Sequence, residues 1–75
     1  MTDIMKINKV AGYRNMLGMT QKEMAVFLGI TAQSYSNKET GKNPFNDKEK
    51  IKLKKLFNRI DGRLSIDDIF FDLEF

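Results

Sequence analysis

The chain of 75 residues contains no cysteine, no histidine and no tryptophan, and it has a single proline. Without cysteine it forms no disulfide and offers no thiolate to a metal ion. Without histidine it lacks the side chain that most often acts as a general base or binds transition metals. We therefore expect no enzyme activity, no cofactor and no metal site, and no small-molecule ligand is evident.

Long apolar runs are also missing from the sequence. No stretch approaches the roughly 18 apolar residues that suggest a membrane span. The first residues lack the apolar core of a secretory signal peptide. We therefore expect a cytoplasmic protein that has no membrane partner.

The apolar residues that are present suffice for one small domain. They make up 41% of the chain, which is too much for a disordered protein. A chain of this length buries only about 60% of its unfolded surface, so its core has to be packed efficiently. We expect a single domain that spans residues 1–75.

Charge is unevenly placed, although the net charge is only +3. Residues 45–63 carry seven lysines and arginines against three acids, whereas residues 64–75 carry four acids and no base. A basic body attached to an acidic tail suits a polyanionic partner such as nucleic acid. The alternative that remains open is a solvated, lysine-rich helix face.

Two helices are predicted in the first part of the chain. Apolar residues at helical spacing predict a helix over residues 7–17, and these are Ile7, Val10, Tyr13 and Leu17. Thr20 and Glu23 have the spacing of a capping box, which predicts that a second helix begins after Thr20. Gly29 predicts where it ends, because glycine accepts the left-handed conformation of a sharp turn.

Three further helices are predicted, over residues 32–40, over residues 47–60 and over a short stretch that ends near Phe70. Their predicted caps are Thr31, Asn46 and Ser65. The fourth helix should bury a broad apolar stripe composed of Ile51, Leu53, Leu56, Phe57 and Ile60. Residues 71–75 form a tail in which apolar and acidic side chains alternate. The fold class is therefore all-α.

Residues 20–41 predict a helix-turn-helix unit whose second helix carries short polar side chains on one face. These candidate base-reading residues are Ala32, Gln33, Ser36 and Asn37. In the major groove, Gln and Asn can pair with adenine, Ser can contact several bases, and the Ala methyl group can meet a thymine methyl group. Taken alone, such a face is more often a solvated helix surface, but here it occurs together with the predicted caps and with Gly29.

A reading helix also has to be held against the DNA backbone. Gln21 begins the second helix, where a side chain and an amide can both meet a phosphate. Lys42 and Asn43 follow the third helix and can make a second phosphate contact. The full set of candidate phosphate-contacting residues is Gln21, Thr31, Lys38, Lys42 and Asn43.

Residues 7–58 resemble the Cro and C-repressor group of helix-turn-helix regulators, the XRE family. The resemblance rests on Arg14, Met19-Thr20-Gln21, Met24-Ala25, Leu28-Gly29-Ile30-Thr31, Tyr35-Ser36, and Glu39 with Gly41-Lys42. It implies a lambda-repressor-like DNA-binding domain, a compact bundle of about five short helices. It also implies a buried ion pair between Arg14 and Glu39, which should be kept or lost together because an unpaired buried charge is costly.

Two positions depart from the pattern of this family. Position 38 is usually apolar, but here it is Lys38, whose stem could cover the core while its ammonium reaches a phosphate. Position 37 is often longer and basic, but here it is Asn37, which has a shorter reach into the groove. The operator sequence of the relatives therefore does not carry over to this chain.

The resemblance implies a sequence-specific regulator of transcription that binds double-stranded DNA. The expected form is a small Cro-like repressor from a phage or mobile element, which acts by occupying its operator. A palindromic operator would then call for a homodimer. Two alternatives are an antitoxin that represses its own operon and binds a toxin through another surface, and a helical module that binds only proteins.

The end of the chain is unusually apolar, and its role is open. Four side chains could fold back onto the domain or form part of a dimer interface, and these are Phe70, Phe71, Leu73 and Phe75. The sequence favours neither use over the other.

Overall fold

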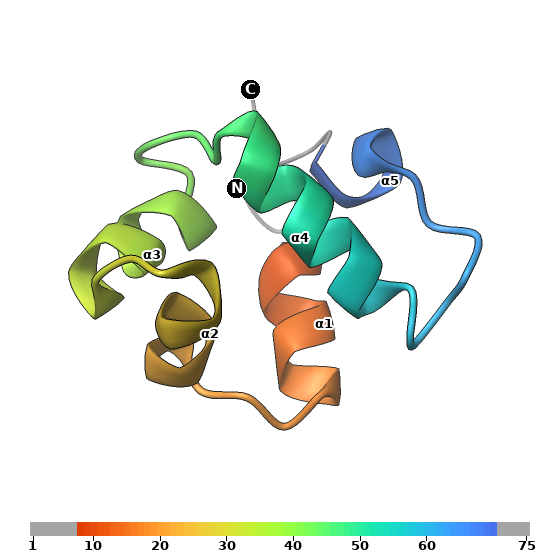
Figure 1. The fold of residues 1–75 in the computed structure, drawn as a ribbon, viewed down its shortest axis with the longest axis horizontal. Coiled ribbons are helices and arrows are strands. Elements are labelled where there is room, and N and C mark those ends of the chain that lie inside the picture. Colours follow the sequence, from red (N-terminus) through yellow and green to blue (C-terminus); the bar gives the residue numbers. More distant parts are fainter. Residues whose placement is uncertain (1–7, 71–75) are drawn as a thin grey trace, which may run out of the picture.

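The computed structural model describes residues 8–70, and these residues form five helices (Figure 1). The helices are α1 (Lys9–Met16), α2 (Gln21–Leu28), α3 (Ala32–Glu39), α4 (Asp47–Phe57) and α5 (Ile66–Phe70). The predicted all-α class and the predicted number of helices are therefore confirmed. No helix in residues 8–70 has the length and apolar content needed to cross a membrane.

Short polar side chains determine where all five helices begin. The predicted cap of α5, Ser65, accepts the Asp68 amide at 3.1 Å, and the Asp68 carboxylate accepts the Ser65 amide at 2.9 Å. The Thr20 side chain accepts the Glu23 amide at 3.0 Å, and the Glu23 carboxylate accepts the Thr20 amide at 2.8 Å, which is the predicted capping box. Asn46 and Glu49 form a second such box at the start of α4. Thr31 caps α3 as predicted. The Asn8 cap on α1 was not predicted, and it places the first helical residue at Lys9.

The turn between α2 and α3 depends on Gly29. Its φ of 75° lies in the left-handed region that glycine enters at little cost, and its own N–H bonds to the last turn of α2. The Ile30 amide then donates to the Ala25 carbonyl at 3.0 Å, which closes the end of α2. The sharp change of direction brings α3 back against α2.

The apolar stripe that was predicted for the fourth helix is only partly correct. Leu53 and Phe57 are fully buried, but Ile51 is 45% exposed and Ile60 is 38% exposed. The helix ends at Phe57, three residues earlier than expected, and Ile60 lies in the turn that follows. The stripe was wider than the side of α4 that the bundle can cover, so its outer members remain in contact with solvent.

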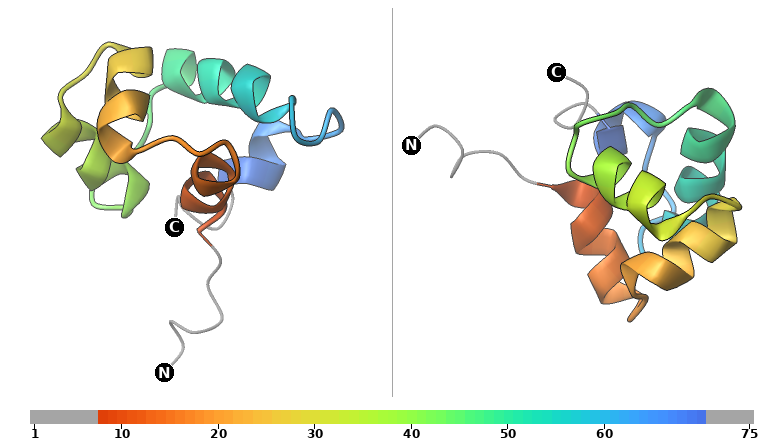
Figure 2. Two further views of the ribbon diagram at one scale, coloured as in Figure 1. Left: turned by 90° about the horizontal axis from the view of Figure 1, so that it is seen from below. Right: turned by 90° about the vertical axis from the view of Figure 1, so that its left-hand side faces the viewer.

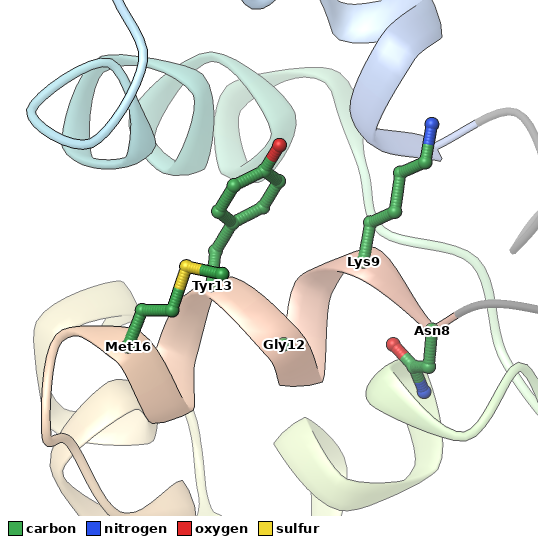
Figure 3. A pocket seen from close by; sticks show the side chains of 5 residues that line it. All are labelled: Asn8, Lys9, Gly12, Tyr13 and Met16. Carbon is green, nitrogen blue, oxygen red and sulfur yellow. The ribbon is translucent and has the colours of Figure 1, made fainter.

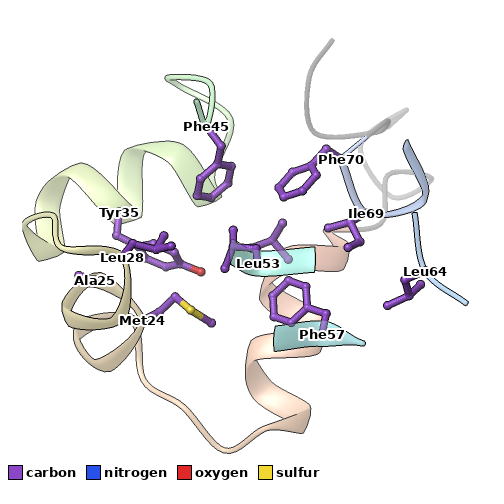
Figure 4. Close-up of a cluster of buried hydrophobic side chains, with 11 residues drawn as sticks. Met24, Ala25, Leu28, Tyr35, Phe45, Leu53, Phe57, Leu64, Ile69 and Phe70 are labelled. Carbon is purple, nitrogen blue, oxygen red and sulfur yellow. The ribbon is translucent and has the colours of Figure 1, made fainter. Parts of the chain in front are cut away.

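Side chains from all five helices and from the loops before and after α4 meet in one core (Figure 4). Its members are Val10, Met24, Ala25, Leu28, Tyr35, Phe45, Leu53, Phe57, Leu64, Ile69 and Phe70. Phe45 was predicted only as a loop residue, yet its ring packs edge-on against Phe70 at a centroid distance of 5.5 Å. The residue before it, Pro44, cannot continue a helix, and Phe45 lies buried in the irregular segment between α3 and α4.

Phe70 belongs to this core, and only 1% of it is exposed. Its predicted place in a dimer interface is therefore corrected, because a side chain enclosed by its own domain has no surface left for a partner. The other three residues of that predicted interface, Phe71, Leu73 and Phe75, lie outside the described residues.

The helices divide into two groups around the core. Helices α2 and α3 pack against each other on one side, while α5 packs against α1 and α4 on the other (Figure 1). The right-hand view of Figure 2 looks onto the α2–α3 side, and α3 lies at the front of the molecule. This arrangement leaves the outer face of α3 open to a large partner.

Candidate nucleic-acid interface

The polar face of α3 consists of the four candidate base-reading residues. Ala32 and Gln33 are exposed, and Ser36 and Asn37 are partly exposed. The opposite side of the helix is buried through Tyr35 and Glu39. The structure therefore places all four candidates on the open side of the helix.

Two of these side chains are joined to each other. Gln33 Nε2 donates to Asn37 Oδ1 at 3.1 Å across one helical turn. Residues four apart on a helix lie one above the other, so this bond holds both amides at the same place on the face. The sequence predicted that the two residues point in the same direction but not that they bond.

Glu39 holds the inner side of α3 in a web of charged and polar contacts. Arg14 Nε lies 2.8 Å from Glu39 Oε2, and Arg14 Nη2 lies 3.3 Å from Oε1. The ion pair that the resemblance implied is thus present, with two parallel bonds. The Tyr35 hydroxyl donates to Oε2, and Gln21 Nε2 donates to Oε1 at 2.8 Å. Side chains from α1, α2 and α3 therefore converge on one carboxylate.

The pKa values of this cluster follow from the same contacts. Burial, the largest influence on Glu39, favours its neutral form, but the hydrogen bonds from Arg14, Tyr35 and Gln21 together outweigh burial and hold the pKa below its ordinary value. The hydrogen bond to Glu39 raises the pKa of Arg14. Burial, and then the bond to Glu39, raises the pKa of Tyr35. The ion pair is therefore charged at neutral pH.

Helix α1 is tied to the helix-turn-helix unit by two more bonds. Arg14 Nη1 donates to the Met19 carbonyl at 2.8 Å, just before α2. Asn8 Nδ2 donates to the Glu39 backbone carbonyl at 2.8 Å, at the end of α3. These bonds fix the positions of the two ends of the unit relative to α1.

Lys38 does not have the free ammonium that was predicted to reach a phosphate. Its Nζ lies 2.8 Å from both carboxylate oxygens of Glu49, and its side chain is only 16% exposed. A cation already paired with a nearly buried carboxylate would leave an unpaired charge if it turned to a phosphate. We therefore remove Lys38 from the candidate phosphate contacts.

The Gln21 side chain is also not free to contact a phosphate, because its amide donates to Glu39. Its backbone amide still lies in the first turn of α2, where the helix dipole favours an anion. The Thr31 hydroxyl oxygen accepts the Ser34 amide and keeps its own hydrogen available for donation. These two candidates retain one donor each.

Lys42 and Asn43 lie in the loop after α3, and both are exposed. Their backbone amides donate to the Asn37 carbonyl at 2.8 and 3.2 Å. These bonds attach the loop to the last turn of α3, so any contact that it makes is in register with the reading face. Lys22, in the first turn of α2, is a further exposed cation that sequence reasoning did not single out.

A separate shallow hollow of about 250 Å³ lies along α1 (Figure 3). It is lined by Asn8, Lys9, Gly12, Tyr13 and Met16. None of these side chains is acidic. Among residues 8–70 no group of three or more potential metal-ligating side chains comes together. The outer face of α3 is therefore the best-defined candidate site in the described part of the chain.

Comparison with known proteins gives one result. A family model described as helix-turn-helix matches residues 10–61. That match includes α1 without its first residue, the whole of α2 to α4, and the whole candidate interface. No curated protein and no solved structure matches the chain.

Proposed function

The chain belongs to the XRE-type helix-turn-helix family of DNA-binding transcription regulators, and from this we propose that it is a sequence-specific repressor of the Cro type. Such a protein binds an operator that overlaps a promoter and blocks RNA polymerase by occupancy. The single observation that supports sequence reading best is the open polar face of α3, held on its inner side by the Arg14–Glu39 pair.

The proposed docking follows from the ends of the helices. Helix α3 enters the major groove, and the first turn of α2 meets the phosphate backbone on one side. Lys42 and Asn43 meet it on the other. Two exposed lysines near these points, Lys22 and Lys42, supply the electrostatic attraction to DNA.

We further propose that the protein binds as a homodimer to a palindromic operator. One α3 covers only a few base pairs, and helix-turn-helix dimers reach two half-sites about 34 Å apart on one face of the duplex. Phage or mobile-element origin belongs to the same proposal, as it comes from the likeness to Cro and C-repressor proteins.

Selection of bound duplexes from a random pool tests this function directly. We expect an enriched palindrome with half-sites separated by one helical turn, and sedimentation should give a dimer on the selected duplex. An enriched single half-site bound by a monomer would contradict the dimer but not the function. A pool that shows no enrichment would contradict sequence-specific binding.

The same selection distinguishes a protein-binding module from a DNA-binding regulator, but it does not distinguish an antitoxin from a repressor. An antitoxin would also enrich an operator, so it is distinguished by capture of a partner protein encoded beside it. A module that binds only proteins would enrich no duplex, and its binding to DNA would be absent at low salt as well. An exposed aromatic tail would favour an antitoxin, because it would offer a surface to a toxin. Phe70 is buried, and the other aromatic residues of the tail lie outside the described residues.

A further inference from the structure

The outer face of α3 carries no free charge. The helix has one acid, Glu39, which is buried against Arg14, and one base, Lys38, which is bound to Glu49. Guanine is read most often by two donors of an arginine or lysine, which meet its O6 and N7 acceptors. The structure removes the only side chain of α3 that could supply such a cation. What remains on the face is one methyl group, one hydroxyl and two amides.

The bond between the two amides limits what they can present. With Gln33 Nε2 donating to Asn37 Oδ1, Gln33 Oε1 and Asn37 Nδ2 have no hydrogen-bond partner among the described residues. The pair thus has one amide oxygen and one amide NH2 group that are left for a base. If both amides were turned over, Gln33 would offer the donor and Asn37 the acceptor, so the combination would be the same.

One donor beside one acceptor matches adenine and mismatches guanine. In the major groove, adenine presents the N7 acceptor next to the N6 donor, whereas guanine presents two acceptors, N7 and O6. Against guanine, one amide oxygen of the pair would face an acceptor and lose its hydrogen bond. Ala32, on the same face, adds a methyl group that can contact the thymine methyl group.

We propose that Gln33 and Asn37 act together as one reader of an A·T base pair, with adenine as the base they bind. This inference rests on the proposed function, since it requires α3 to lie in the major groove. It goes further by naming the base pair and by assigning its recognition to two side chains that are already bonded to each other in the free protein.

The test starts from the duplex that the selection enriches. Each A·T pair of a half-site is replaced in turn by G·C, and the affinity of the full-length protein is measured for every duplex. One replacement should lower the affinity roughly 5- to 150-fold, the range expected for a bidentate contact. Placing 7-deaza-adenine at that position removes only the N7 acceptor, and it should lower the affinity as well.

Variants then assign the contact to the two amides. Gln33→Ala and Asn37→Ala should each remove most of the discrimination at that position, and the double variant should lose little more, because the two residues act as a unit. Gln33→Arg should shift the preference at that position toward guanine. Met16→Ala, at an exposed position of α1 (71% exposed), is the matched control and should keep the discrimination.

Several results would overturn the inference while leaving sequence-specific binding intact. The first is a half-site in which every position that resists replacement is a G·C pair. The second is discrimination that is unchanged in both alanine variants. The third is a Gln33→Arg protein that still prefers adenine. A pool with no enriched duplex is a different result, since it contradicts the proposed function itself. Circular dichroism of each variant checks that it is folded, so that a lost base preference can be assigned to base recognition.

Discussion

Lys38 and Glu49 form an ion pair that joins the reading helix to the start of α4. The Lys38 ammonium lies 2.8 Å from both oxygens of a carboxylate whose side chain is 7% exposed. The same carboxylate accepts the Asn46 amide in the capping box of α4. A residue that resembled a DNA contact in the sequence is therefore a link between two helices.

Breaking this link should destabilise the protein. Lys38→Met leaves Glu49 as an unpaired, nearly buried charge, and the loss of one partner of such a pair costs about 3 kcal/mol. Adding Glu49→Gln should restore part of the stability, because glutamine keeps the capping box without the charge. Urea unfolding of both proteins measures the difference, and a single variant as stable as wild type would show that the pair contributes nothing.

The salt dependence of DNA binding gives a second test of Lys38. If its charge is neutralised by Glu49, Lys38→Met should leave the slope of log affinity against log salt unchanged under conditions where the variant is folded. A slope reduced by about 0.9 would instead mean that the ammonium leaves Glu49 and meets a phosphate.

Replacement of Lys42, unlike that of Lys38, should change the salt dependence of DNA binding. Lys42→Ala should weaken binding to all duplexes to a similar extent and reduce the salt slope by about 0.9, since one phosphate contact is lost. Lys55→Ala is the matched control, because it also removes an exposed cation, from α4 beside Phe27 and outside the proposed contacts. Equal slopes for the two variants would exclude Lys42 as a specific phosphate contact.

The lowered pKa of Glu39 predicts how the stability of the fold depends on pH. Because its pKa in the folded protein is below the ordinary value of 4.5, the charged carboxylate stabilises the fold above about pH 4.5, and this contribution is lost as the pH falls through the lower pKa. Glu39→Gln should be several kcal/mol less stable at pH 7, since it leaves Arg14 unpaired. The gap between the two proteins should narrow as the pH is lowered below about 4.5, as measured by thermal unfolding. A gap that is constant over this range would argue against the ion pair.

Two glycines should respond in opposite directions to the same change. Gly29→Ala forces a Cβ into the left-handed region, which costs roughly 1–2 kcal/mol, although the added atom meets nothing within 4 Å. Gly12→Ala lies inside α1, where the added Cβ also meets nothing within 4 Å, and it should stabilise the protein by roughly 0.5–1 kcal/mol. Chemical denaturation of both variants checks the signs, and a stabilising Gly29→Ala would contradict the role of that turn.

The sequence by itself determined the local features of this protein. Caps at Thr20, Thr31 and Asn46 and the turn at Gly29 act within a few residues of chain, so their spacing predicts where helices begin and end. The polar face of α3 could be predicted for the same reason, because helical periodicity alone brings its four residues together. The Arg14–Glu39 pair was accessible only through the likeness to a family, since its partners are 25 residues apart.

Tertiary structure alone decided which of several available partners each side chain has. In the sequence, Lys38 could have met a phosphate and Glu49 could have capped a helix and done nothing more. The fold places the end of α3 near the start of α4, so the two charges pair. From the sequence, Phe45 was predicted as a loop residue and Phe70 as a candidate interface residue. In the structure the helix bundle encloses both rings. Such pairings depend on burial, which raises the cost of an unpaired charge and rewards an enclosed ring. Burial is a property of the whole arrangement of helices, so no local pattern in the sequence determines it.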